Sequence, residues 1–281
     1  MSSHAQEIEQ AQRFEFGKNW ARFLRLINNE RLAHAQEALS AMLGTKSLHG
    51  KSFLDVGSGS GLSSLSAARL GARRIHSFDF DPQSVACTRE LKRRYFPDFA
   101  DWTIEEGSVL DPAYLAALGQ FDIVYSWGVL HHTGQMWKAL EALPPLVATD
   151  GLLFVAIYND QGRTSRHWRA VKKFYIKGWL SKAIVLSVFV PYFFARGVAV
   201  DLLKLRNPMA RYGEYAKHRG MSVVRDWIDW LGGYPFEVAK PEEIFELYQK
   251  RGFTLLKLKT CGGGLGNNEF IFVNRASPHA L

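Results

Sequence analysis

The chain has 281 residues, 47% of them hydrophobic, with a formal net charge of +8 and an isoelectric point near 9.4. This length supplies one substantial apolar core and excludes two large independent domains. Cys87 and Cys261 are far apart and lack zinc-type spacing, so we expect no metal site and reduced thiols in the cytoplasm. Residues 1–10 are polar, and we do not expect export. The positive charge favours an anionic partner, whether nucleic acid, a membrane surface or an acidic small substrate.

The first expected element is a helix over residues 7–43. Its apolar side chains recur at helical spacing and form one stripe, made of Phe14, Phe16, Trp20, Phe23, Leu24 and Ile27. We therefore expect residues 1–48 to form a helical cap or lid.

Residues 53–61, Phe-Leu-Asp-Val-Gly-Ser-Gly-Ser-Gly, form an apolar run that breaks into three alternating glycines. The run indicates a buried strand, and the glycines allow a sharp turn whose backbone N–H groups face a ligand. The helix that follows directs its positive end toward that ligand. A dinucleotide fingerprint would place the third glycine one position later. The pattern therefore predicts a loop that binds a nucleotide-type cofactor other than a dinucleotide.

Strands and helices alternate through the next hundred residues. We expect strands at 51–56, 74–79, 102–106, 121–126 and 151–158, and helices at 61–70, 82–95, 111–118 and 135–148. Such alternation indicates a parallel sheet with helices on both faces and a ligand at the carboxyl ends of the strands. Asp55, Asp79, Ser108 and Ser126 fall at such ends. Asp79 is placed to accept hydrogen bonds from both hydroxyls of a ribose.

After residue 160 the alternation stops for about 75 residues, which we interpret as an insertion spanning 161–238. Residues 163–177 form a basic run with interleaved aromatic residues, either a solvated helix face or a contact for an anionic substrate or phospholipid. Residues 183–195 are the most apolar stretch, shorter than the roughly 20 residues of a spanning helix. We expect a buried or pocket-lining helix pair here, with an interfacial segment as the alternative.

The D-x-G-x-G-x-G form at residues 55–61 resembles the class I S-adenosylmethionine-dependent methyltransferases. The resemblance covers roughly residues 50–160 and returns weakly at 240–275. It implies an α/β, Rossmann-like, doubly wound and mostly parallel seven-stranded sheet, with an N-terminal helical cap and a helical insertion after strand 5. Residues 49–160 would be the S-adenosylmethionine-binding core, 161–238 the acceptor pocket or lid, and 239–281 the completion of the core.

The resemblance also implies S-adenosylmethionine as cofactor, S-adenosylhomocysteine as product, and a role for each matching residue. The predicted cofactor-binding residues are Asp55, Gly57, Ser58, Gly59 and Gly61 at the methionine end, Asp79 at the ribose, Phe80, Ser108 and Val109 at the adenine, and Ser126 and Trp127 beside the methyl-transfer site.

The methyl group of a sulfonium is already activated, so the protein must mainly align the acceptor and exclude water. A hydroxyl acceptor would gain from a nearby base, and His131 and His132 are the candidates, although both could simply shape the loop. Tyr158 and Asn159 follow the fifth strand toward the same cleft, where we expect one of them to contact the acceptor.

These features predict a methyltransferase that acts on a small-molecule acceptor. O-methylation is favoured, and an anionic or lipid-like substrate is one option. The layout is loosely similar to the ubiquinone-biosynthesis O-methyltransferases, but residues 130–134 read Leu-His-His-Thr-Gly, without the Glu-His pair looked for there, so a quinone does not follow. Two alternatives stay open: an RNA or protein methyltransferase, although no RNA-binding module is recognisable, and a non-catalytic membrane-associated factor. We expect a cytoplasmic protein and no nucleic-acid partner; a peripheral membrane contact through 177–200 and a homo-oligomer are left open.

Overall fold

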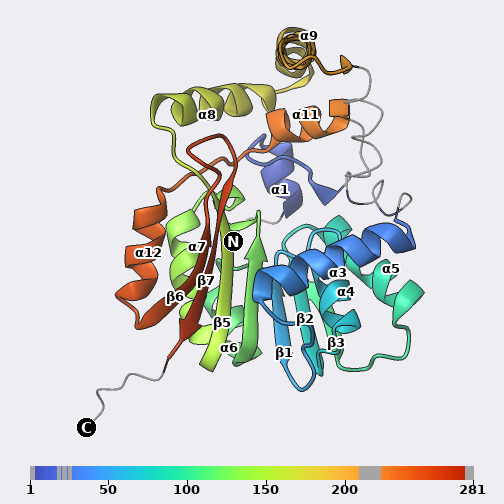
Figure 1. The fold of residues 1–281 in the computed structure, drawn as a ribbon, viewed down its shortest axis with the longest axis vertical. Helices are drawn as coiled ribbons and strands as arrows, with labels where there is room; N and C mark the ends of the chain where they lie inside the picture. Colours follow the sequence, from blue (N-terminus) through green and yellow to red (C-terminus); the bar gives the residue numbers. More distant parts are fainter. Residues whose placement is uncertain (1–3, 18–19, 21–23, 25–26, 209–222, 276–281) are drawn as a thin grey trace.

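The computed structural model describes residues 4–17, 20, 24, 27–208 and 223–275. Their centre is one seven-stranded sheet in the order β3-β2-β1-β4-β5-β7-β6 (Figure 1). The strands are β1 Ser52–Val56, β2 Arg74–Asp79, β3 Trp102–Glu106, β4 Phe121–Trp127, β5 Val147–Tyr158, β6 Phe253–Lys259 and β7 Asn267–Asn274. The first five pair in parallel, whereas β7 runs antiparallel to β5 and β6. The predicted α/β fold with a mostly parallel sheet is confirmed.

Helices cover both faces of this sheet, so its central strands are buried on both sides. All five residues of β1 are buried; Leu54 and Val56 face one apolar cluster while Phe53 faces the other, as expected from the two-residue repeat of a strand. The first cluster lies under α6 (Pro112–Leu118), α7 (Met136–Ala142) and α12 (Pro241–Gln249), and the second under α3 (Asn29–Leu43), α4 (Leu62–Arg69) and α5 (Pro82–Tyr95).

The N-terminal region differs from the single helix expected over 7–43. Helix α1 covers only His4–Glu9, and α3 begins anew at Asn29 because the Asn28 side chain caps it by accepting the Arg31 N–H at 2.9 Å. The chain between them is not helical at residues 12–16. Phe23, part of the expected apolar stripe, lies outside the described residues.

The helix expected over 135–148 is also shorter. Helix α7 ends at Ala142, and Pro144–Leu146 form the short 3-10 helix η2 before β5 begins at Val147. Pro144 and Pro145 explain the break, since proline lacks an amide donor and its ring clashes with the preceding turn.

The insertion forms a helical layer above the carboxyl ends of the strands, made of α8 (Arg163–Tyr175), α9 (Trp179–Leu203) and α11 (Val223–Gly232) (Figure 1). The expectation of a buried helix pair at 183–195 is wrong. That run is the middle of the 25-residue helix α9, whose buried residues are Ser181, Val185 and Asp201. The inner side of α9 packs on α8 and α11, while most of its other side chains face outward.

Candidate active site

A cavity of about 1450 Å³ opens where β1, β2 and β4 end. Its walls come from the glycine loop after β1, the residues that follow β2, β3 and β4, the N-terminal segment and α11. Pockets for a single small ligand usually measure about 300–1,000 Å³. The cavity therefore has room for a nucleoside-sized cofactor and a second molecule.

The glycine loop approaches the cavity through its backbone. Gly57 adopts φ +77°, and a side chain there would begin 2.3 Å from a methyl carbon of Val129, in the loop after β4. Gly59 adopts φ +54° and faces the Trp20 ring, which would lie 3.3 Å from an added Cβ. Gly61 instead caps α4 against Thr88 and lies outside the cavity lining. The loop is thus shaped for contact between backbone and ligand.

Asp79 organises this loop from the end of β2. Its carboxylate accepts the N–H of Gly59 and the N–H of Asp81, each at 2.9 Å. Asp55, at the end of β1, accepts the Ser64 hydroxyl at 2.5 Å. Both carboxyls line the cavity, and burial raises the pKa of Asp55 to about 7 and that of Asp79 to about 6.

These two carboxyls and the glycine loop that lines the cavity fit the expected cofactor. Desolvation disfavours a carboxylate, and a ligand that brings a cation or hydroxyl donors restores its charged form. The amino group and ribose hydroxyls of S-adenosylmethionine are such donors. Asp55 and Asp79 are therefore the residues suited to hold them.

Cofactor affinity should consequently depend on pH. The ligand favours ionised carboxylates, so protons held by Asp55 and Asp79 below their raised pKa values of about 7 and 6 must be released on binding. We expect the affinity for the cofactor to rise with pH from about pH 5 and to level off above about pH 7.5. Each carboxyl contributes at most about a tenfold rise per pH unit. Calorimetry in buffers of different ionisation enthalpy measures both affinity and proton release. Affinity that is constant across this range would contradict the assignment.

Replacing Asp79 by alanine should weaken cofactor binding by about 1.5–3 kcal/mol, as expected for hydrogen bonds to a charged group. Titration calorimetry gives the change, and thermal unfolding checks that the loop remains folded. Glu106→Ala is a matched control, because Glu106 ends the neighbouring strand β3 and is exposed. Equal affinity in the wild type and Asp79→Ala would remove Asp79 from the site.

The predicted adenine residues Phe80, Ser108 and Val109 all line the cavity. The Ser108 hydroxyl accepts the N–H of Leu110 at 3.1 Å, which fixes the turn after β3. The Arg13 guanidinium lies 5.2 Å from the centre of the Phe80 ring.

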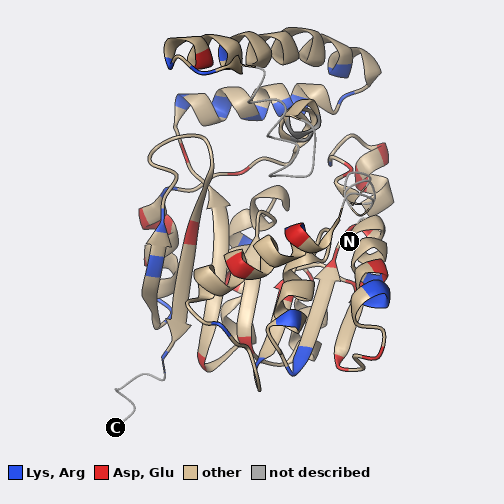
Figure 2. Ribbon diagram, turned by 45° about the vertical axis from the view of Figure 1, so that its right-hand side comes forward, with Lys and Arg blue, Asp and Glu red and all other residues tan. Residues whose placement is uncertain are grey.

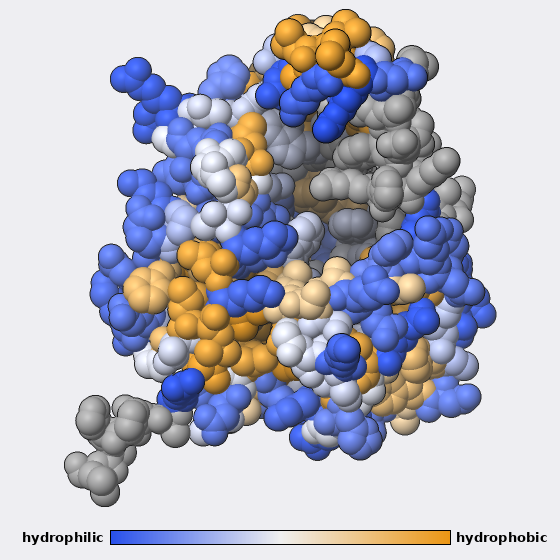
Figure 3. Space-filling model, viewed as in Figure 1, coloured by the Kyte–Doolittle hydropathy of each residue, from blue (hydrophilic) through white to orange (hydrophobic). Residues whose placement is uncertain are grey.

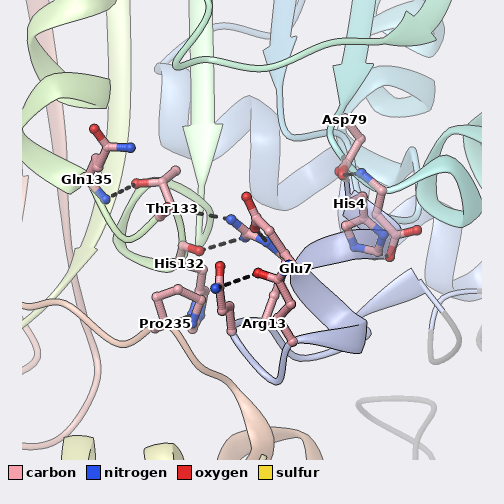
Figure 4. Close-up of polar contacts among 11 residues, drawn as sticks. His4, Glu7, Arg13, Asp79, His132, Thr133, Gln135 and Pro235 are labelled. Atoms are coloured by element: carbon pink, nitrogen blue, oxygen red, sulfur yellow. Dashed lines mark hydrogen bonds and ion pairs between the residues drawn. The ribbon is translucent and has the colours of Figure 1, made fainter. Parts of the chain in front are cut away.

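The N-terminal segment lies beside the cavity and contacts both the loop after β4 and the residues after β2 (Figure 4). Arg13 pairs with Glu7 at 2.6 Å and donates to the carbonyl of His132 at 2.8 Å. On the other side, the Gly17 N–H donates to Asp81 at 2.8 Å, and His4 lies 3.5 Å from the same carboxylate. The segment lines the cavity. The sequence did not single out Arg13, because nothing local marks its distant partners.

Ser126 and Trp127 differ in their placement. Ser126 is fully buried, and its hydroxyl donates to the Val56 carbonyl at 3.2 Å, joining β4 to β1 outside the cavity lining. Trp127 lines the cavity with 47% of its surface exposed. Ser58 also lines the cavity, with its hydroxyl 3.1 Å from that of Thr88.

The two histidines lie in the 3-10 helix η1 (Leu130–His132), but only His132 lines the cavity. Its Nδ1 is 2.6 Å from the Pro235 carbonyl (Figure 4). A carbonyl can only accept, so Nδ1 carries the proton and Nε2 keeps its lone pair. Burial lowers the pKa of His132 to about 3, so the ring is neutral. His131 is fully buried against Tyr158, with ring centres 4.0 Å apart, and burial lowers its pKa too.

Tyr158 and Asn159 also separate. Tyr158 lines the cavity, and burial raises the pKa of its hydroxyl to about 12, so the group remains a proton donor. Asn159 lies outside the lining and joins the β6–β7 turn by accepting from Asn268 at 3.0 Å and donating to the Gly264 carbonyl at 3.3 Å.

Asn267 is a lining residue that the sequence did not reveal. It pairs with Tyr158 in the antiparallel β5–β7 register, and its buried Oδ1 has no hydrogen-bond partner within the described part of the chain. Only strand pairing brings it there. Aromatic residues of the N-terminal segment and of α11 also line the cavity: Phe14, Phe16, Trp20, Trp227 and Trp230.

Lys172 departs from the rest of the basic run. It is fully buried, its amine donates to the Trp230 carbonyl, and it lies 4.4 Å from the Trp230 ring centre and 5.0 Å from that of Phe236. Burial lowers its pKa to about 7. It thus packs between the insertion and the wall of the cavity, whereas Lys173 and Lys177 face solvent.

Comparisons with known proteins agree with this geometry. A family profile described as a methyltransferase domain matches residues 54–153. A ubiquinone biosynthesis O-methyltransferase of Methylobacterium sp. (strain 4-46) is 30% identical over 170 residues, covering 57% of this chain and 64% of that protein. A ribosomal protein methyltransferase of Thiobacillus denitrificans is 34% identical over 99 residues, covering 35% of this chain and 28% of that protein. The chain thus spans less than two thirds of each relative's length.

Solved structures show the same fold. Magnesium protoporphyrin IX methyltransferase from Synechocystis, with bound SAH, aligns over 92% of this chain and 95% of that chain, with a TM-score of 0.53 and 14% identity. PKMT2 from Rickettsia typhi, in complex with AdoHcy, aligns over 86% of this chain and 54% of that chain, with a TM-score of 0.56 and 16% identity. The glycine loop, the two buried carboxyls and the methyltransferase domain agree on S-adenosylmethionine as the cofactor, and the solved neighbours share the fold. Residues 54–153 are therefore a methyltransferase domain of the class I, S-adenosylmethionine-dependent type.

Proposed function

We propose that this chain transfers the methyl group of S-adenosylmethionine to the oxygen of an apolar small molecule. The lining of the cavity carries the proposal, because it combines the glycine loop and two buried carboxyls with aromatic side chains from the N-terminal segment and α11, and it includes His132. We assign the aromatic region to the acceptor and call it the acceptor half. The O-methyltransferase among the relatives adds support at low identity. Because the cap and α11 both contribute aromatic residues to the acceptor half, we favour a small molecule over RNA or protein. The free cysteines favour the cytoplasm as the working compartment.

When bound, S-adenosylmethionine supplies a methyl group on a positively charged sulfur. Asp55 and the glycine loop would hold its amino-acid end, and Asp79 would accept from its ribose. The aromatic residues of the cap and α11 exclude water from the acceptor half. Tyr158 and Asn267 offer a donor and an acceptor that orient the substrate hydroxyl.

His132 takes the proton of that hydroxyl through Nε2 while its Nδ1–H remains bonded to Pro235. An oxygen that is gaining a methyl group becomes a far stronger acid than imidazolium, even with the lowered pKa of His132. A neutral imidazole is therefore basic enough at the moment of transfer, and the Pro235 carbonyl stabilises the charge that it acquires.

Labelling tests the proposal directly. Purified protein is incubated with methyl-labelled S-adenosylmethionine and cell extract, which is then separated into lipid, small-metabolite, RNA and protein fractions. Extract alone and extract with the Asp79→Ala variant give the background. We expect label above background in the lipid or metabolite fraction. Label confined to RNA or protein would overturn the substrate class, and cofactor binding without any label would favour a non-catalytic role.

A further inference from the structure

Helix α9 presents an apolar face to solvent. The outward side chains include Trp179, 80% exposed, Val188, 56% exposed, and Leu203, 85% exposed. Leu180, Ile184, Val188 and Tyr192 recur every four residues and form this face, whereas Trp179 and Leu203 are exposed at the two ends of the helix. In Figure 3 this face forms the orange group at the top of the molecule. Soluble monomers rarely expose contiguous apolar patches larger than a few hundred Å², and such patches mark contacts with proteins or membranes.

Positive charge surrounds this face. Lys173 and Lys177 are exposed on and just after α8, Lys182 and Arg196 on α9, and Lys204 just beyond it. Figure 2 shows the blue Lys and Arg positions along α8, beside the long apolar helix. From residue 163 to 206 the sequence contains a single acidic residue, Asp201, and it is buried. The exposed charge of this segment is therefore entirely positive.

The inner side of α9 is fixed to the layer below. Phe189 lies 5.1 Å from the Trp168 ring centre, and Phe193 lies 5.5 Å from Trp227 and 5.9 Å from Trp230. Helix α9 is long and apolar enough to cross a membrane, the one such helix in the described part of the chain. Crossing would separate these aromatic contacts and would place Arg196 inside the bilayer. A position in the plane of the interface keeps both.

We propose that the outer face of α9 docks onto an anionic lipid bilayer. The helix lies along the boundary between headgroups and acyl chains, and the lysines and arginines around it contact the anionic headgroups. Apolar burial and electrostatic attraction to anionic headgroups together give such helices their affinity. The docking goes beyond methyl transfer and does not depend on turnover.

A second copy of the chain fits this face less well than a bilayer does. In a symmetric dimer the same patch faces itself, so the lysines around α9 would approach each other with no exposed acidic partner from residues 163–206. The position relative to the cavity also favours a membrane. Trp227 and Trp230 pack on α9 and line the cavity at the same time. The acceptor half therefore lies directly beneath the docking face, where an acceptor dissolved in the bilayer could enter.

Flotation of the full chain with lipid vesicles tests the docking. Phosphatidylcholine vesicles are used with and without phosphatidylglycerol, at low and high salt. We expect flotation with the anionic vesicles that weakens with salt. The variant Leu180→Ser/Ile184→Ser/Val188→Ser should lose at least about tenfold in vesicle affinity, since it removes three membrane-facing side chains. Lys173→Glu/Lys177→Glu should lose mainly the preference for anionic lipid.

The control is Leu256→Ser/Leu258→Ser, which removes exposed leucines from β6 and should float like the wild type. Cofactor affinity and thermal unfolding confirm that each variant is folded. Absence of wild-type flotation, or equal flotation of the α9 variant, would overturn the proposal. So would resistance to alkaline extraction, which indicates a spanning helix. A dimer that the α9 variant dissociates, in protein that does not float, would assign the face to a second copy instead.

Discussion

Replacing His132 by alanine should lower the rate of methyl transfer by about 10²–10⁴-fold, the usual contribution of a positioned general base. Cofactor affinity should change little, because the carboxyls and the glycine loop hold the cofactor and Arg13 binds the backbone carbonyl of residue 132, which alanine keeps. The measurement is single-turnover transfer to the labelled fraction, with calorimetry for cofactor binding.

His131→Leu is the matched control for this prediction. His131 is the adjacent histidine and is buried too, but it lies outside the cavity lining, so its replacement leaves the imidazole of the site in place. We expect transfer to persist in His131→Leu wherever the variant is folded. Full activity in His132→Ala, or an equal loss in both variants, would contradict a base role for His132.

Gly57→Ala should reduce cofactor affinity by at least about 100-fold. The added Cβ would start 2.3–2.9 Å from three carbons of the Val129 side chain, and φ +77° is a conformation that alanine resists. The backbone cost alone is roughly 1 kcal/mol, so most of the loss comes from displacing Val129 and the glycine loop relative to each other. Calorimetry and thermal shift with added cofactor measure the effect.

Two further variants separate the clash from the backbone cost. Val129→Gly removes the side chain that the methyl group added at position 57 would meet, so the double variant should recover most of the lost affinity. Gly44→Ala places the same residue at φ +69° with no atom within 4 Å of its Cβ, at the end of α3. It should lower stability by about 1 kcal/mol and leave cofactor binding intact. Near-normal binding by Gly57→Ala would show that the loop does not need this close approach.

The core of the fold could be predicted because its determinants are local. The apolar strand at 53–56 and the glycines after it define the cofactor loop within nine residues. Parallel strands necessarily bring their carboxyl ends to one edge, so Asp55 and Asp79 could be placed at the cavity without knowing any contact. The helix expected at 82–95 likewise begins at Pro82 as α5, where Asp81 caps it by accepting the Gln83 N–H at 2.8 Å.

The acceptor half could be predicted only in outline. Asn267 enters the cavity because β7 pairs antiparallel with β5, and Arg13 reaches His132 across 119 positions of sequence. His131 and His132 are neighbours with the same local pattern, yet the turn of η1 directs only one of them into the cavity. Such choices depend on long-range packing, which no short motif encodes.

The sequence by itself determined the class of fold, the cofactor loop and the mostly parallel sheet, because spacing, glycine conformation and strand direction act over a few residues. Only the tertiary structure decided the roles of the insertion. Within one basic run, Lys172 is buried among aromatic rings while Lys173 faces solvent, and the apolar residues of α9 divide between an inner side that packs and an outer face that does not. Both sides of α9 are apolar, so composition does not distinguish them. Which side is buried depends on the other parts of the chain that pack against it.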